Sequence, residues 1–322
     1  MPVVSTALCR ILRHYRDRRF LLVEAGGNFG DELIYRGMYA LAKEIGLECV
    51  SATYAEFMSA RYPREWVVYV HGGGGYVPWW SGRSIHALGR ALEEHSGVVI
   101  LGPTTFHSDR AYLQETLRRD LDRRVSEEIF LFTREAVSHT AVSEIAGEDA
   151  HALLDHDTAL NLTSSDLLRL APGEGTRARR RYPLYAIRED KEWLDVGRFN
   201  PLRSPLDPIA FCRSFEHWLQ LHLSARRIVT NRLHSAICGS GLGTPTTLLP
   251  NSYYKNRGVW ELSLKERGVQ WQDAMPVGEL TRLLFGLTRR LMGRGRIRRL
   301  HQRWYFGRPP EGGRIAARSH AR

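Results

Sequence analysis

Residues 226–250, RRIVTNRLHSAICGSGLGTPTTLLP, decide how this chain is expected to fold. The apolar β-branched pair 228–229 indicates the end of a short buried strand. Thr230 and Asn231 are residue types favoured at helix N-caps, so a helix is predicted to follow and to end at the glycines of 239–243. The apolar residues before the final proline predict the next strand, which gives the strand–helix–strand order of an α/β protein.

Arg232 and His234 lie two residues apart where this strand is expected to give way to the helix. Open α/β sheets bind ligands at the carboxyl ends of their strands, and a helix N-terminus attracts anions. Histidine changes its charge near neutral pH, so the pair suits an anionic substrate that also exchanges a proton. An isolated pair of this kind is more often a surface arginine and a structural histidine.

A glycine-rich turn near the N-terminus has a related arrangement. Residues 25–32, AGGNFGDE, lie between the apolar run 19–24, a predicted strand, and a predicted helix over 33–45. Strand, glycine-rich turn and helix form the phosphate- or sugar-binding opening of a doubly wound domain, although the turn is not the GxGxxG of a dinucleotide site. Asn28 and Asp31 are candidates to face a ligand there, or to cap the helix.

A second glycine-rich segment, residues 72–75, follows the predicted strand 66–71. Consecutive glycines permit positive φ and expose successive N–H groups, which suits an anion or a polar sugar. On this basis we expect three glycines to line the site: Gly72, Gly73 and Gly74. The aromatic residues that come next suit stacking on a sugar ring, or core packing: Tyr76, Trp79 and Trp80.

Two further arginines follow predicted strands. Arg134 comes directly after the apolar run 129–132, and Arg188 ends the short run that opens the second half of the chain. Repeated arginines at strand ends indicate a clamp for carboxylate or phosphate. Lys255, in the polar loop 251–256, is a further candidate to bind the same anion.

The length of 322 residues exceeds one typical domain, so two α/β domains are expected. A polar, basic stretch over residues 164–183 marks the predicted boundary. We therefore predict an N-terminal domain over 1–170 and a C-terminal domain over 182–290, which includes a helix over 208–221. A basic tail follows over 291–322.

Positive charge is concentrated at the C-terminus. Residues 289–322 contain eleven arginines and one glutamate, so they carry +10 of the net charge of +11. Clustered arginine with Trp304, Tyr305 and Phe306 is compatible with binding to an anionic membrane surface, or with a solvated tail. Nothing in the chain resembles a base-reading motif, so we expect no nucleic-acid partner.

Other patterns limit the protein class. No apolar run approaches the roughly 20 residues of a membrane span, and arginines interrupt the N-terminus where a signal peptide would be apolar. The four cysteines are scattered without metal-ligand spacing: Cys9, Cys49, Cys212 and Cys238. We expect a cytoplasmic protein without a structural metal.

Five motifs, taken together and in order, resemble the polysaccharide pyruvyl transferase family. They are GGNFGD at 26–31, HGGGG at 71–75, TREAVS at 133–138, TNRLHSAI at 230–237 and NSYYKN at 251–256. Each piece is a weak signal, but the ordered set is specific. The resemblance covers residues 20–262. It implies two Rossmann-like doubly wound domains similar to the GT-B glycosyltransferases, with the active site in the interdomain cleft.

The resemblance also implies an activity. The family transfers the enolpyruvyl group of phosphoenolpyruvate onto two hydroxyls of one sugar, which forms a pyruvate ketal and releases phosphate. It implies phosphoenolpyruvate as donor substrate, no cofactor or metal, and a sugar or lipid-linked oligosaccharide of a cell-surface polysaccharide as acceptor. Three residues match the family's donor-site positions: Arg134, Arg232 and His234.

The chemistry fits these residue types. Phosphoenolpyruvate carries about three negative charges at neutral pH, which arginines and helix N-termini match. Ketal formation requires protonation of the enol carbon and attack by two hydroxyls. We expect His234 to act as the acid/base group, Asp31 to activate an acceptor hydroxyl, and the glycines 72–74 to line the acceptor side.

Two alternatives remain compatible with the sequence: a GT-B-type nucleotide-sugar glycosyltransferase and a non-catalytic glycan-binding protein. Because many cell-surface polymers are built on lipid carriers, the basic tail would hold a peripheral enzyme at the inner face of the membrane by charge.

Overall fold

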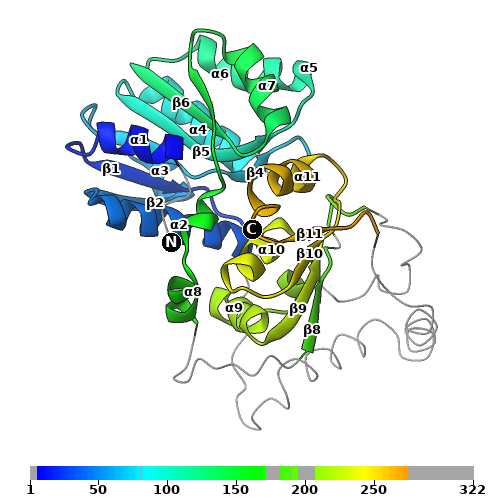
Figure 1. Cartoon of the computed structure of the whole chain (residues 1–322). Coiled ribbons are helices and arrows are strands. Elements are labelled where there is room, and N and C mark those ends of the chain that lie inside the picture. Colours follow the sequence, from blue (N-terminus) through cyan, green and yellow to red (C-terminus); the bar gives the residue numbers. More distant parts are fainter. Residues whose placement is uncertain (1–5, 81, 172–181, 189, 195–206, 275–322) are drawn as a thin grey trace, which may run out of the picture.

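Two parallel β-sheets form the frame of the protein in the computed structural model (Figure 1). The structure describes residues 6–80, 82–171, 182–188, 190–194 and 207–274. The predicted α/β class with parallel sheets is confirmed. The predicted basic tail at 291–322 lies outside the described residues. Among those that are described, no helix is long and apolar enough to cross a membrane.

The first sheet has strand order β2-β1-β3-β5-β6-β7, and β4 pairs with β5 beside this path. The strands are β1 (Phe20–Glu24), β2 (Cys49–Thr53), β3 (Val67–Val70), β4 (Gly73–Tyr76), β5 (Val98–Phe106), β6 (Glu128–Thr133) and β7 (His151–Leu154). All pairings are parallel. The strand order reverses between β1 and β3, and ligands bind at such a switch point. Both glycine-rich turns follow these two strands.

Helices cover both faces of this sheet. They are α1 (Thr6–His14), α2 (Phe29–Ile45), α3 (Tyr54–Ser59), α4 (Arg83–Glu94), α5 (Arg110–Leu113), α6 (Arg119–Asp122) and α7 (Ala136–Ala146), with a π-helical segment, Gln114–Arg118, between α5 and α6. In β1, Leu21 and Val23 pack into the core beneath α3, α4 and α7, whereas Phe20 and Leu22 pack beneath α1 and α2. This alternation explains why the strand reads as continuously apolar.

The segment after β3 differs from the expected glycine-rich loop. Residues 73–76 form β4, which pairs with the second half of β5, so β5 extends to Phe106 through Gly102 and Pro103. Pro103 has no N–H to donate, and the pairing of β5 with β6 shifts register between Leu101 and Thr104 around it. A Gly-Pro pair is typical of a turn, but here it lies within β5.

The second sheet is smaller and has the order β11-β10-β9-β8. Its strands are β8 (Tyr182–Ala186), β9 (Ala225–Thr230), β10 (Thr246–Leu248) and β11 (Gln270–Trp271), and its helices are α8 (Ser164–Leu170), α9 (Phe215–Leu223), α10 (Leu233–Gly241) and α11 (Lys255–Val259). The predicted strand–helix–strand unit of residues 226–250 is present as β9, α10 and β10.

The helix predicted over 208–221 is wrong in its boundaries. Pro208–Ala210 is a single 3₁₀ turn capped by Asp207, and α9 begins only at Phe215, where the Ser214 side chain accepts a hydrogen bond from the His217 N–H. The local cap at Ser214 therefore sets the start of the helix.

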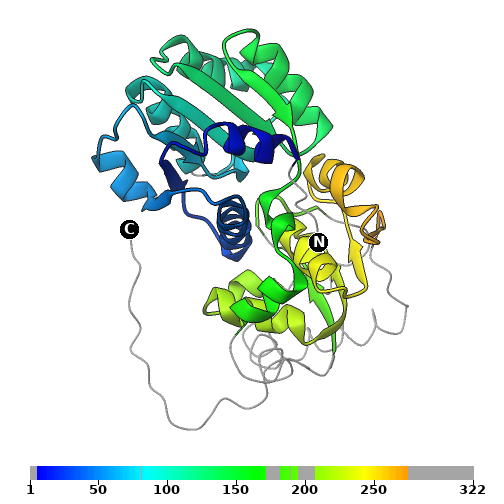
Figure 2. The same cartoon turned by 60° about the vertical axis from the view of Figure 1, so that its left-hand side comes forward.

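Helix α2 connects the two halves of the molecule. Its residues Leu33, Ile34 and Tyr35 share a buried cluster with Trp218 of α9 and Ile237 of α10. Figure 2 shows α2 (dark blue) beside the yellow-green helices of the second sheet. The N-termini of α2 and α10 are thereby brought to the same region between the sheets.

Candidate functional site

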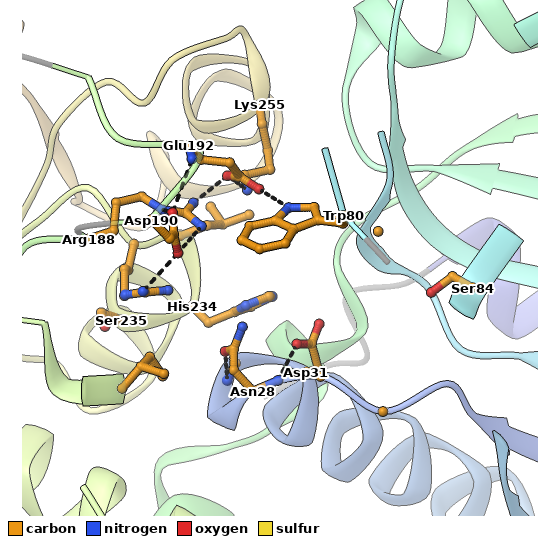
Figure 3. Close-up of a pocket in the computed structure, with 18 of the residues that line it drawn as sticks. Asn28, Asp31, Trp80, Ser84, Arg188, Asp190, Glu192, His234, Ser235 and Lys255 are labelled. Atoms are coloured by element: carbon orange, nitrogen blue, oxygen red, sulfur yellow. Dashed lines mark hydrogen bonds and ion pairs between the residues drawn. The ribbon is translucent and has the colours of Figure 1, made fainter. Parts of the chain in front are cut away.

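A cavity of about 650 Å³ lies between the two sheets. Residues from both halves line it, among them most of the predicted site residues: Asn28, Asp31, Gly74, Arg134, Arg188, Arg232, His234 and Lys255. Figure 3 shows several of these side chains directed into the pocket from opposite sides. The prediction that strand-end arginines of both halves approach one cleft is consistent with this arrangement.

One end of the cavity holds Arg134 and Lys255. Arg134 follows β6 and is 1% exposed; its Nε donates to the Thr105 hydroxyl at 2.9 Å. Lys255 is the first residue of α11, rather than part of a loop as predicted. A Cβ on Gly74 would lie 3.4 Å from Arg134 Nη2 and 3.5 Å from Lys255 Nζ, so this glycine lies directly over both cations. Its lack of a side chain leaves room for a ligand beside them.

Arg188 and Arg232 lie together on the side of the second sheet. Arg188 follows β8 and binds both carboxylate oxygens of Asp190, at 2.7 and 2.9 Å. Arg232 follows β9, donates to Asp207 through Nε at 2.5 Å, and reaches the shared Asp190 through Nη2 at 3.1 Å. Burial alone would raise the pKa of Asp190, but hydrogen bonds and charge from Arg188, with the charge of Arg232, lower it to about 2.

Glu192 connects the cation groups. Its carboxylate accepts hydrogen bonds from Arg188, Lys255 and the indole of Trp80, the last at 2.8 Å. Burial opposes ionisation, but the charges of Lys255 and Arg188 lower the pKa of Glu192 to about 2. Burial lowers the pKa of Lys255 to about 8, although Glu192 acts in the opposite direction. Lys255 therefore titrates closer to neutral pH than an ordinary lysine.

His234 is the second residue of α10 and is fixed from two directions. Its Nε2 lies 3.3 Å from Asp157 Oδ2, and the same carboxylate accepts a 2.5 Å bond from Arg134 Nη1. On its other side the imidazole packs against Gly30 of α2, where an added Cβ would lie only 2.3 Å from Nδ1. Burial would raise the pKa of Asp157, but the charges of Arg134 and His234 hold it well below its ordinary value.

The N-terminus of α10 has no side-chain cap. Thr230 and Asn231 were predicted to provide one, but Arg232 occupies the cap position. The Thr230 hydroxyl donates to the Ala186 carbonyl and accepts from the Arg232 N–H, while the side-chain oxygen of Asn231 accepts from the Arg188 N–H, so both residues brace the neighbouring strand. The first N–H groups of α10 are therefore available to an anion at the cavity.

Ser235 adds a hydroxyl to this helix terminus. It is 1% exposed, lines the cavity, and its Oγ has no hydrogen-bond partner within the described residues. An unpaired buried hydroxyl is unfavourable, and a bound anion or polar group would satisfy it.

Asn28 and Asp31 form a capping box on α2. The Asn28 side chain accepts from the Gly30 N–H at 2.8 Å, and Asp31 accepts from the Asn28 N–H at 2.7 Å. The capping alternative is therefore present for both residues. Both residues also line the cavity, so each caps the helix and faces the pocket at the same time.

The glycines 72–74 do not share one position. Gly74 lines the cavity, whereas Gly72 and Gly73 are not among the lining residues. A Cβ on Gly72 would lie 2.2 Å from the carbonyl oxygen of Pro103, so this glycine permits close approach of the backbone of β5. Gly73 has φ of 140° and faces Asp31.

Sequence reasoning missed the carboxylates that accompany every predicted cation. They are Asp157, Asp190, Glu192 and Asp207, and each is in an ion pair. Asp190 and Glu192 come two and four residues after Arg188 in the sequence, and this proximity was a signal that they could pair with it. Asp157 pairs with Arg134 only through the fold. Among the described residues, no group of three or more histidine, cysteine or acidic side chains is placed to hold a metal.

Comparison with known proteins agrees with the sequence motifs. A sequence model of the polysaccharide pyruvyl transferase family matches residues 28–253. No protein with curated annotation matches the chain. A solved structure of a functionally uncharacterised protein from Klebsiella pneumoniae subsp. pneumoniae is similar in fold, with a TM-score of 0.60 and 19% identity. The likeness covers 83% of this chain and 97% of the other, and at this identity it shows the fold alone.

Proposed function

Because the chain belongs to the polysaccharide pyruvyl transferase family, we propose that it transfers the enolpyruvyl group of phosphoenolpyruvate to a sugar as a cyclic ketal. One observation carries the proposal: Arg134 and the Arg232/His234 pair line the same cavity. Arg134 follows β6 of the first sheet in the sequence, and the pair follows β9 of the second. Phosphoenolpyruvate is small, carries both phosphate and carboxylate, and needs cations from more than one direction.

The donor is held by cationic, N–H and hydroxyl groups that can still make hydrogen bonds in the free protein. Arg134 Nη2 and Lys255 Nζ face the space over Gly74, and the uncapped N-terminus of α10 offers N–H groups beside the Ser235 hydroxyl. Because the lining arginines are already paired with carboxylates, they hold their positions before the donor arrives. Phosphoenolpyruvate then accepts further hydrogen bonds from these same groups.

The reaction requires two proton transfers. A proton is added to C3 of phosphoenolpyruvate, and one sugar hydroxyl bonds to C2 and loses its proton. The C2–O bond to phosphate breaks, the second hydroxyl bonds to C2, and its proton leaves with the phosphate. Two hydroxyl protons are released, one is consumed at C3, and the other is carried by phosphate. His234, oriented by Asp157, is the proposed acid/base group, and proton transfer of this kind contributes about 10²–10⁴ in rate.

Calorimetric titration with phosphoenolpyruvate tests donor binding. Arg134→Lys and Arg232→Lys keep the charge but lose the planar fork, so each is expected to raise Kd at least about tenfold. Arg257→Lys is the matched control, because Arg257 pairs with Glu261 on the surface and does not line the cavity. No binding to the wild type, or equal Kd values in all four proteins, would contradict the proposal.

The acceptor and the location of the protein belong to the same proposal. We infer a cell-surface polysaccharide or its lipid-linked precursor as acceptor, a GT-B-like pairing of the two sheets as separate domains, and work at the cytoplasmic face of the membrane. The tail, residues 291–322, would supply attachment through its arginines at up to about 1 kcal/mol each. Sedimentation with phosphatidylglycerol vesicles should be lost on deletion of the tail and in high salt; equal sedimentation without it would refute attachment by charge.

A further inference from the structure

Trp80 bridges the two halves of the molecule at the cavity. It follows β4 of the first sheet, and its Nε1–H donates to Glu192 Oε1, in the second half, at 2.8 Å. Lys191 Nζ donates to the neighbouring Trp79 carbonyl at 2.9 Å. Figure 3 shows the Trp80 indole reaching into the pocket, with Glu192 and Lys255 near its nitrogen edge. The ring is thereby held in a fixed position.

Trp80 differs from the other aromatic residues of its segment. Tyr76 is fully buried and packs on Phe106. Trp79 packs edge-to-face on His107 and Tyr253, with ring centroids 5.3 and 5.2 Å apart, and does not line the cavity. Trp79 and Trp80 are both half-buried, but Trp80 alone of the three lines the cavity. Tyr76 thus follows the core-packing alternative and the Trp79 ring is occupied by its aromatic neighbours, while the Trp80 ring faces the cavity.

The surroundings of this ring suit a carbohydrate. Much of the lining is charged or glycine, and the other tryptophan there, Trp218, is only 1% exposed. A pyranose has ring C–H groups that pack on an aromatic surface, while its hydroxyls project from the ring edge toward polar groups. In Figure 3, His234, Asn28 and Asp31 lie across the pocket from the indole. A sugar on Trp80 would direct hydroxyls toward them.

The size of the cavity leaves space for such a ring. Phosphoenolpyruvate has a three-carbon skeleton and is smaller than one sugar, and about 650 Å³ is within the range of pockets that take much larger ligands. The donor groups of the proposed function gather around Gly74 and the N-terminus of α10. The space beside Trp80 is therefore left for the second substrate.

We propose that Trp80 is the platform on which the pyranose ring of the acceptor stacks, and that Glu192 holds the platform in place. This inference rests on the proposed function, because it assigns the second substrate of that same cavity. Since Glu192 also binds Lys255 and Arg188, one carboxylate fixes the acceptor platform relative to the donor cations. Trp80 is then a substrate-binding residue that selects for a stackable ring.

Saturation-transfer NMR with methyl glycosides tests the assignment directly. The probes are methyl β-D-glucopyranoside, methyl β-D-galactopyranoside and methyl β-D-mannopyranoside. Inorganic phosphate replaces phosphoenolpyruvate in these samples, so no group transfer can occur. The wild type should transfer saturation to the ring C–H protons of at least one glycoside. Trp80→Leu should reduce that transfer about fivefold to tenfold, Trp80→Phe should retain more of it, and Trp79→Phe should leave it unchanged.

Donor binding separates this proposal from the one on which it rests. Calorimetry should give phosphoenolpyruvate Kd values within about threefold of the wild type for both Trp80 variants, which also shows that they are folded. Equal saturation transfer to the wild type and Trp80→Leu would overturn the platform while leaving the proposed function intact. No transfer from the wild type to any of the three glycosides would also count against it. Absence of phosphoenolpyruvate binding to the wild type would instead refute the proposed function.

Discussion

Adding one methyl group at Gly30 is expected to displace His234 without unfolding the protein. Gly30 is the second residue of α2, and among the described residues it is not one of the glycines with positive φ, so alanine fits the backbone. The Cβ of Gly30→Ala would lie 2.3 Å from Nδ1 and 2.9 Å from Cγ of His234. Since ordinary contact begins near 3.4 Å, the imidazole must move by about 1 Å.

This displacement has a calculable consequence for function. His234 Nε2 is already 3.3 Å from Asp157, so a movement of about 1 Å breaks that contact and turns the ring from its orientation. Misplacement of a reacting group by about 1 Å costs on the order of 10² in rate. Stability changes less, because alanine favours the helix by up to about 1 kcal/mol while the crowding costs about 1–3 kcal/mol.

The assay compares phosphate release from phosphoenolpyruvate in the presence of the glycoside that gives the wild type its highest rate. Gly30→Ala should lower kcat about 100-fold, with circular dichroism unchanged. The control is a double-mutant cycle with His234→Ala, which removes the two ring contacts and leaves only the 3.0 Å contact with the Cβ of residue 234, so Gly30→Ala should cost less stability in that background in urea unfolding. A kcat within threefold of the wild type would refute the view that this imidazole must be held in place.

Three more predictions concern the charged groups of the cavity. Asp157→Asn leaves Arg134, which is 1% exposed, without its counter-charge, so urea denaturation should show a loss of about 3–5 kcal/mol; a loss below about 1 kcal/mol would contradict a buried ion pair. The Kd for phosphoenolpyruvate should rise as pH rises through about 8, because Lys255 is a cation below its pKa and neutral above it; in Lys255→Arg calorimetry should show no such inflection. Burial lowers the pKa of Lys255 from its ordinary value of 10.5 to about 8, so between these pH values the unfolded chain binds a proton more readily than the folded protein. The free energy of unfolding should therefore fall as pH is lowered from about 10 to 8, and Lys255→Met should remove that slope.

The sequence predicted those parts of the site that depend on strand ends. Arg188 and Arg232 follow β8 and β9, which are neighbouring parallel strands of one sheet and end at a common edge, so their proximity follows from topology. Position along the chain is enough for that inference. Arg134 follows a strand of the other sheet, so its place in the same cavity depends on how the two sheets pack.

The rest depended on three-dimensional packing. Asp157 neutralises Arg134 and orients His234, but its partners are 23 and 77 residues away in the chain. Gly30 has a sequence signal for a turn, yet its role against the imidazole exists only because α2 packs on α10. A Gly-Pro pair is typical of a turn, yet β5 continues through Gly102 and Pro103 because β4 pairs with its second half. Local pattern carries no information about such distant contacts.

In the proposed function, cationic side chains of both sheets bind one molecule of phosphoenolpyruvate beside His234. A crystal structure of the wild-type protein with this compound would show where it binds. We expect its phosphate and carboxylate within hydrogen-bond distance of Arg134 and of the Arg232–Ser235 end of α10, with His234 adjacent. A donor bound away from this cavity, or one contacting only one of the two halves, would contradict it.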